Sequence, residues 1–302
     1  MDIINNIEQK RIRAGWRILL QIALFVLILG AVRFLLFDHL LYSVRYISIG
    51  LIAFFSVWIC ARFVDLRSLA DFGLQKNYLW WKELAYGFFM GGVMMTAIYI
   101  FYRMMGWVEI TGYGWEREHF TSYAFALFGY FVAMSSVGFY EELIFRGYQT
   151  RNLAEGIRTS NLSNTSASVI AVLITSLAFG ILHYGNPNAS LLSTAIITFA
   201  GIMFGLPYII TGRLSIPIGL HISWNFFQGG IYGMPVSGIP TRVSLLQTRI
   251  EGPLQWTGGR FGPEASMVGL IAVAILTICI LLYLRRSGYK LKAISGFTKP
   301  PV

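Results

Sequence analysis

The sequence predicts an all-α membrane protein, a polytopic bundle of transmembrane helices. Of its 302 residues, 56% are hydrophobic and only 13% are charged, whereas soluble domains carry about 25% charged residues. The mean hydropathy is +0.61. Apolar stretches of about 20 residues, which is the length needed to cross a hydrocarbon core of about 30 Å, recur along the chain. We therefore expect a single transmembrane domain over residues 1–302.

Eight segments are long and apolar enough to be expected as spans. The first should be a retained helix, because its apolar run is longer than that of a signal peptide and no small-residue cleavage site follows it. The longest connection, 233–264, is rich in Gly and Pro and is expected to be an exterior loop, and a basic tail follows the last span. The expected spans are about 18–37, 44–61, 84–102, 121–145, 166–184, 191–211, 214–232 and 265–284.

The positive charge is distributed unevenly among the connections. The net charge of +10 would suggest nucleic acid in a soluble protein, but membrane proteins concentrate Lys and Arg in cytoplasmic loops. With eight spans, 17 of the 24 Lys and Arg residues, including Lys10, fall on the side of the termini, and seven, including Arg117, fall on the other side. We expect both termini in the cytoplasm and no nucleic-acid partner. Cys60 and Cys279 lie in apolar runs, which argues against a disulfide framework or a cysteine metal site.

Three ionisable residues interrupt the fourth apolar stretch. No charge occurs from 123 to 140, and then Glu141, Glu142 and Arg146 follow. Charged groups inside a membrane are costly, rare and usually functional. On a helix, Glu142 and Arg146 are four residues apart and can pair on one face. That pairing leaves Glu141 without a local partner.

Two further polar intrusions lie on other spans. His183 ends the fifth apolar run, and His221 and Asn225 are spaced to share one face of a helix. Because unsatisfied polar groups in hydrocarbon are costly, these side chains should face the interior of the bundle. Together with Glu141 and Glu142 they could build one buried site. The structural alternative is an interhelical hydrogen-bond network that holds the bundle together.

These residues also form three ordered motifs, and through them the sequence resembles the CPBP family of intramembrane proteases. The family includes type II CAAX prenyl endopeptidases and bacteriocin-processing and self-immunity proteins. Gly147 and the stretch 69–74 look similar as well, so the resemblance covers the core from 62 to about 232. The three motifs are matched by Glu141, Glu142 and Arg146, by Phe179 and His183, and by His221 and Asn225.

The resemblance implies an intramembrane endopeptidase that cleaves a membrane-anchored or lipidated, CAAX-type protein or peptide, in a bacterial plasma membrane. Two alternatives stay open. One is a bacteriocin-immunity or scaffold protein of the same family that does not need proteolysis. The other is a proton-coupled transporter that uses buried Glu and His as a relay, although no pair of broken helices in related halves is apparent.

The residues suggest roles for a peptide hydrolase. Glu141 is the candidate general base, because burial raises the proton affinity of a carboxylate, while Glu142 and Arg146 support it as a pair. His221 and Asn225 could stabilise the oxyanion, and His183 could orient the attacking water.

A metal-dependent arrangement is the other possibility. Glu141, His183 and His221 could hold Zn²⁺ or another divalent metal, because two histidines and a glutamate are a known catalytic zinc set. The family has been described in both ways, so metal dependence stays open.

The site residues reach a common depth only if the helices are irregular. Glu141 and His183 match in depth if the fourth helix runs on to about residue 157, with a turn near 161 or 162. His221 would still require a tilted or short sixth span. We therefore also expect irregular geometry in 185–215.

Overall fold

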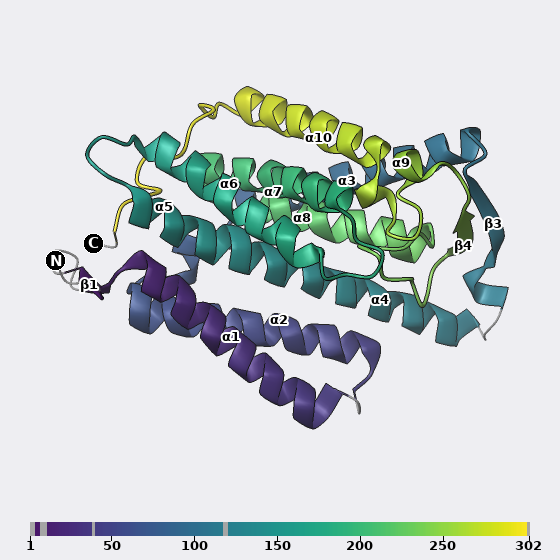
Figure 1. The fold of residues 1–302 in the computed structure, drawn as a ribbon, viewed down its shortest axis with the longest axis horizontal. Helices are drawn as coiled ribbons and strands as arrows, with labels where there is room; N and C mark the ends of the chain where they lie inside the picture. The colour runs from purple at the N-terminus through teal and green to yellow at the C-terminus, as the bar shows by residue number, and fades with distance from the viewer. Residues whose placement is uncertain (1–3, 7–10, 38–39, 117–119, 301–302) are drawn as a thin grey trace.

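Long helices that run roughly along one axis form the body of the protein (Figure 1). The computed structural model describes residues 4–6, 11–37, 40–116 and 120–300, and Lys10 and Arg117 lie outside these ranges. Within them, seven helices are long and apolar enough to cross a membrane, so the all-α transmembrane class is confirmed and the chain is an integral multi-pass membrane protein. These helices are α1 (Ala14–Leu36), α2 with its extension (Tyr42–Asp65), α3 (Tyr78–Met104), the fourth helix (Thr121–Ile157), α6 (Asn164–His183), α7 (Leu191–Thr211) and α10 (Met267–Arg286).

The fourth helix is continuous well beyond residue 145. It comprises α4 (Phe120–Glu141), the π-helical segment η5 (Glu142–Thr150) and α5 (Arg151–Ile157). The expected extension to about residue 157 is therefore confirmed. The change from α- to π-helix falls between Glu141 and Glu142. π-helical turns within α-helices are rare and are frequently found at functional sites.

The expected span 214–232 is not one of the seven long helices. It consists of α8 (Ser215–Asn225) and the π-helical η6 (Phe226–Ile231). α8 is surrounded by protein and packs against α3 so closely that a Cβ at Gly219 would lie 2.1 Å from the carbonyl oxygen of Leu84. Hydropathy predicted a span because α8 is apolar, but its apolar side chains contact other helices. The count of eight spans and the cytoplasmic termini derived from it are not confirmed.

We expected irregular geometry between residues 185 and 215. Most of this range is a regular helix, and the irregular backbone lies on its two sides. α7 is a continuous helix that includes Pro207. The turn 184–190 and the left-handed Gly212 flank it on its two sides. The short α8 then places its histidine in the middle of the bundle.

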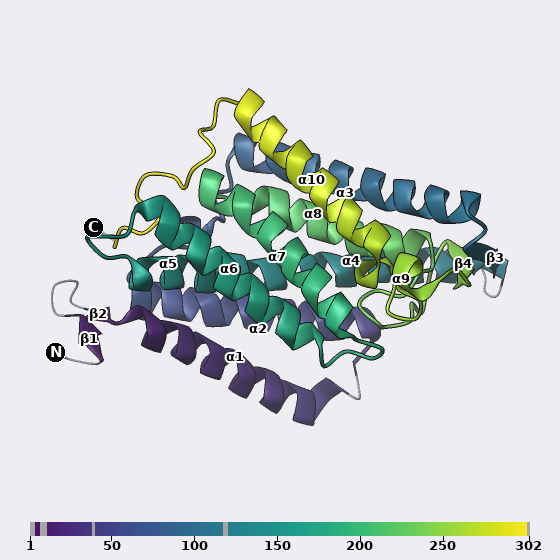
Figure 2. The ribbon, with the colours of Figure 1, turned by 45° about the horizontal axis from the view of Figure 1, so that its top comes forward.

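The ends of the bundle carry the remaining elements. The N- and C-termini lie together at one end, and the strands β3 and β4 lie at the other (Figures 1 and 2). We call the latter the strand end. The predicted loop 233–264 contributes β4, α9 and most of η7, and four short strands depart from a purely helical fold. The elements are β1 (Asn5–Asn6), β2 (Arg11–Ile12), η3 (Leu69–Phe72), β3 (Val108–Tyr113), η4 (Gly114–Glu116), β4 (Leu246–Ile250), α9 (Leu254–Thr257) and η7 (Pro263–Ala265). β1 pairs with β2 and β3 with β4, both antiparallel.

A buried charged cluster joins elements near the termini. Arg17 Nη1 lies 2.9 Å from Asp65 Oδ1, and Arg17 Nη2 lies 2.7 Å from Glu155 Oε1. Arg67 Nη2 donates to Glu155 Oε2 at 2.8 Å, and Arg11 also pairs with Glu155. We call this the arginine cluster: Arg11, Arg17, Asp65, Arg67, Glu155 and Tyr148, whose hydroxyl donates to Asp65 Oδ2.

Candidate active site

Three of the expected site residues meet in the interior of the bundle. Arg146 Nη1 donates to Glu142 Oε1 at 3.1 Å, which is the pair expected from their spacing. Nδ1 of His221, from α8, lies 2.8 Å from the same oxygen. Because a carboxylate oxygen accepts, Nδ1 carries a hydrogen and Nε2 is left for other contacts. Glu142 therefore fixes both the tautomer and the orientation of the His221 ring.

Glu141 lies on the other side of the same imidazole. Its Oε2 is 3.7 Å from Nε2 of His221, which is too long for a direct hydrogen bond. This oxygen is buried and has no hydrogen-bond partner in the described part of the chain. Arg146 bonds to Glu142 instead. Glu141 thus offers a buried acceptor close to an imidazole nitrogen, which is the arrangement a general base requires. We call Glu141, Glu142, Arg146 and His221 the glutamate cluster.

Aromatic rings pack against Arg146 and His221 of this cluster. The guanidinium carbon of Arg146 lies 4.1 Å from the ring centroid of Phe179, and the imidazole of His221 stacks on Phe204 with centroids 5.1 Å apart. Gly201 makes room for the arginine, because a Cβ at that position would lie 3.1 Å from Nη2 of Arg146 and closer still to Ser176. The phenylalanine of the second motif therefore packs against the arginine of the first.

His183 ends α6 and packs against Phe179. Its Nδ1 lies 2.8 Å from the carbonyl oxygen of Phe179. Since a carbonyl only accepts, Nδ1 is the protonated nitrogen, and Nε2 of the neutral ring presents a lone pair. The two rings have centroids 4.5 Å apart. The spacing of the second motif thus sets the tautomer of its histidine.

An internal cavity of about 50 Å³ brings the second and third motifs together. His183, His221 and Asn225 all line it, among mainly apolar side chains of α6, α7 and α10. Since one water needs at least about 10–15 Å³, the cavity can hold a few waters. Glu141 is not among the described residues that line it, but its Oε2 lies 3.7 Å from Nε2 of His221, which does line it.

Sequence reasoning missed one carboxylate of this cavity. Glu264, in η7, also lines it, together with Ser237. The backbone N–H of Ser237 donates to Glu264 Oε2 at 2.5 Å, and the hydroxyl donates to the same oxygen at 3.1 Å. Burial raises the pKa of Glu264 from 4.5 to about 7. Its only signal in the sequence is a lone acidic residue just before the last span, which is also typical of a solvated loop.

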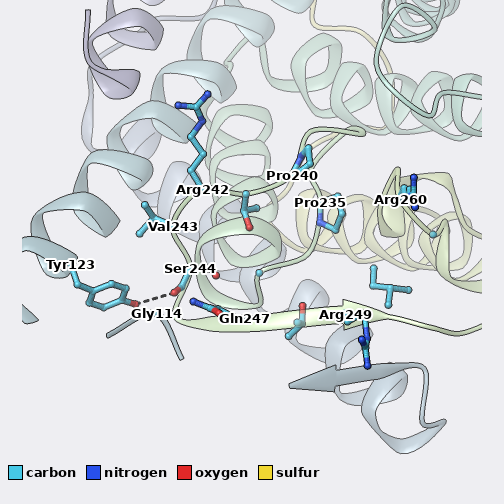
Figure 3. A pocket seen from close by; sticks show the side chains of 15 residues that line it. Gly114, Tyr123, Pro235, Pro240, Arg242, Val243, Ser244, Gln247, Arg249 and Arg260 are labelled. Carbon is cyan, nitrogen blue, oxygen red and sulfur yellow. Dashed lines mark hydrogen bonds between the residues drawn. The ribbon is translucent and has the colours of Figure 1, made fainter. Parts of the chain in front are cut away.

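A larger pocket of about 730 Å³ lies at the strand end (Figure 3). Arg242, Arg249 and Arg260 are among the residues that line it, and Tyr123 donates a hydrogen bond to the carbonyl of Ser244 across one side (Figure 3). None of the residues of the three motifs lines it. Chemistry is therefore better sought in the small interior cavity.

The proposed zinc ligands do not form a metal site as they are placed. Within the described ranges, no three His, Cys, Asp or Glu side chains converge in a way that could hold a metal ion. The Nδ1 contacts of His183 and His221 would not by themselves prevent metal binding, because such contacts commonly orient an imidazole whose Nε2 is the ligand. It is the spacing of the side chains that fits a metal ion poorly, so no step below uses one.

Comparison with known proteins points to the family that the motifs suggested. Residues 123–227 match the family model described as type II CAAX prenyl endopeptidase Rce1-like. The chain is also 24% identical over 204 residues to the uncharacterized protein YyaK of Bacillus subtilis (strain 168), which covers 64% of this chain and 63% of that protein. No solved structure matches. The match is narrower than the expected range 62–232, but it contains all three motifs. The resemblance to this family of CAAX-type proteases is therefore confirmed, and residues 123–227 carry it.

Proposed function

We propose that the protein is an intramembrane endopeptidase in which Glu141 activates water for attack on a peptide bond. The observation that carries the proposal is the buried, unpartnered Oε2 of Glu141 beside Nε2 of His221. Arg146 is bonded to Glu142 and so leaves Glu141 available. The family similarity of residues 123–227 supports the reaction class.

The remaining motif residues have supporting roles in this proposal. Glu141 takes a proton from water as the oxygen attacks the carbonyl carbon. His221, with a hydrogen on Nε2 as well as on Nδ1, and the carboxamide of Asn225 stabilise the oxyanion. His183 orients the water through Nε2, since its Nδ1 is engaged. Glu142 and Arg146 hold the ring of His221 in place.

The substrate class follows from the site's surroundings. The cavity is enclosed by α6, α7, α8 and α10, and most of its lining is apolar. A peptide bond reaches it most easily when the substrate is itself held in the bilayer. We propose a membrane-anchored or lipidated protein or peptide of the CAAX type, cleaved in a bacterial plasma membrane.

The test is cleavage of a panel of quenched prenylated and transmembrane peptides by the purified protein. Wild type, Glu141→Gln, His183→Ala and the surface control Glu251→Gln are compared, with and without a chelator and with zinc added back. We expect cleavage by wild type and the control, loss in the other two, and no effect of the chelator. Cleavage by Glu141→Gln at the wild-type rate, or no cleavage by wild type, overturns the proposal. Loss with chelator that zinc restores would replace the metal-free mechanism.

A further inference from the structure

Glu264 reaches the cavity from outside the region that matches the family. It lies in η7, just before α10, whereas the match ends at residue 227. Both hydrogen bonds from Ser237 go to Oε2. The side chain of Gln228 also hydrogen-bonds this carboxyl. Glu264 shares the wall of the cavity with His221 and Asn225.

The position of Glu264 is fixed by contacts among three loops at the strand end. Asn186 Nδ2 donates to the carbonyl of Ser237 at 3.0 Å, and the N–H of Gly238 donates to the carbonyl of Phe261 at 2.8 Å. Gly238 has φ +82°, and a Cβ there would lie 1.9 Å from Pro187 O. These contacts place the carboxyl by tertiary packing, as is expected of a group with a defined role in a site.

Phe261 connects these loops to the second motif. It is almost fully buried and belongs to the same apolar cluster as Phe179. Phe179 in turn packs against both Arg146 and His183. The loops that position Glu264 and the second motif therefore share one apolar cluster.

The electrostatic surroundings of Glu264 suit proton transfer near neutral pH. Burial raises its pKa, while the Ser237 donors and the neighbouring His221 favour the charged form. Tyr130 of α4 also interacts with its charge, and His183 lines the same cavity. Because these effects partly cancel, both protonation states are accessible near pH 7, as a general acid requires.

We propose that Glu264 is a further catalytic residue, the general acid that protonates the leaving amine. This role rests on the proposed peptidase function. When the tetrahedral intermediate collapses, the C=O bond re-forms and the C–N bond breaks with its electron pair going to nitrogen. The nitrogen takes the proton from the carboxyl group of Glu264, and the Ser237 and Gln228 donors stabilise the resulting carboxylate. The proton that Glu141 took from water returns to Glu264 through cavity water after the products leave.

The test compares two leaving groups. Wild type, Glu264→Gln and the control Glu251→Gln are assayed on a panel peptide and on a peptidyl nitrophenyl ester, whose leaving group departs without protonation. Gln keeps an oxygen that can accept both Ser237 hydrogen bonds but has no acidic proton. We expect peptide cleavage to fall about 10²-fold or more in Glu264→Gln, with ester cleavage changed less than about threefold. A melting curve in detergent checks that the variant is folded.

A second variant separates catalysis from support. Ser237→Ala removes one donor to the carboxylate, so the alkaline limb of the pH profile for peptide cleavage should move to higher pH. Equal loss of peptide and ester cleavage in Glu264→Gln, or an unchanged peptide rate, overturns the role of Glu264 while the peptidase proposal stands. No peptide cleavage by wild type overturns the peptidase proposal and this role with it.

Discussion

The arginine cluster and the glutamate cluster contain similar side chains but are satisfied to different degrees. In the arginine cluster, both oxygens of Asp65 and both oxygens of Glu155 accept from a donor. In the glutamate cluster, a single arginine faces two glutamates. Oε2 of Glu141 and Oε2 of Glu142 have no partner in the structure as described.

This difference distinguishes a cluster that stabilises the fold from one that could act in catalysis. A buried carboxylate holds a fold in place when both of its oxygens are compensated by cations or donors, and losing a partner leaves a costly unpaired charge. A buried carboxylate with an unpartnered oxygen can still accept a hydrogen bond. Water or a reacting substrate can donate it. We therefore assign the arginine cluster to stability and the glutamate cluster to catalysis.

The largest expected effect is on catalysis. Glu141→Gln keeps the shape of the side chain but removes the base, so peptide cleavage should fall by about 10²–10⁴-fold. The melting temperature should change little, because no hydrogen bond to Oε2 is lost. Activity and melting are measured on the same preparation. A large drop in melting temperature would mean that Glu141 is structural after all.

The arginine cluster should show the opposite behaviour. Glu155→Gln leaves Arg11, Arg17 and Arg67 with one carboxylate fewer, which should cost about 3–5 kcal/mol of stability. Cleavage per folded molecule should persist. The matched control is Glu109→Gln, which breaks an exposed pair with Arg249 and should cost much less stability, because solvent screens exposed ion pairs. Equal losses of melting temperature in Glu155→Gln and Glu109→Gln would contradict the assignment of the arginine cluster to stability.

Asn225 lines the cavity together with His221 of the glutamate cluster, so its replacement tests the proposed oxyanion site. Asn225→Ala removes one proposed oxyanion donor, so kcat should fall by about 10²–10³-fold with a smaller change in KM. Thermal denaturation of this variant should resemble that of wild type, because the side chain faces the cavity. An unchanged kcat would show that the carboxamide of Asn225 does not stabilise the oxyanion.

The smallest expected effect concerns stability against pH. Glu264 has its pKa raised by burial from 4.5 to about 7, so the folded state binds its proton more tightly than the unfolded state. This contribution is fully present below about pH 4.5 and is lost as pH rises through about 7. Between these values wild type should lose more thermal stability than Glu264→Gln. Parallel curves for the two proteins would contradict the raised pKa.

Local spacing predicted what lies within one helix. The pair of Glu142 and Arg146 and the long fourth helix followed from i, i+4 spacing and from matching depths, and both are present. The catalytic roles stay predictions. The span expected at 214–232 is not confirmed: α8 and η6 form a helical segment there, but hydropathy does not distinguish a helix that faces lipid from one that faces other helices. The two environments require the same apolar side chains.

Contacts between distant segments could not be predicted in this way. The arginine cluster joins Arg17, Asp65 and Glu155, and its arginines were taken only as markers of the cytoplasmic side. Glu264 meets Ser237 through folding of the connection 233–264, which was expected only to be an exterior loop. In each case the partners are set by the tertiary fold, and a single sequence contains no spacing that reveals them.

The most direct test of the central claim is chemical rescue of Glu141→Ala by formate. The substitution removes the carboxylate and leaves space for a small one, whereas Glu155→Ala serves as the control at the arginine cluster. We predict that peptide cleavage by Glu141→Ala is lost and rises with formate concentration, and that formate does not change the rate of Glu155→Ala. Full cleavage by Glu141→Ala without formate would contradict the account.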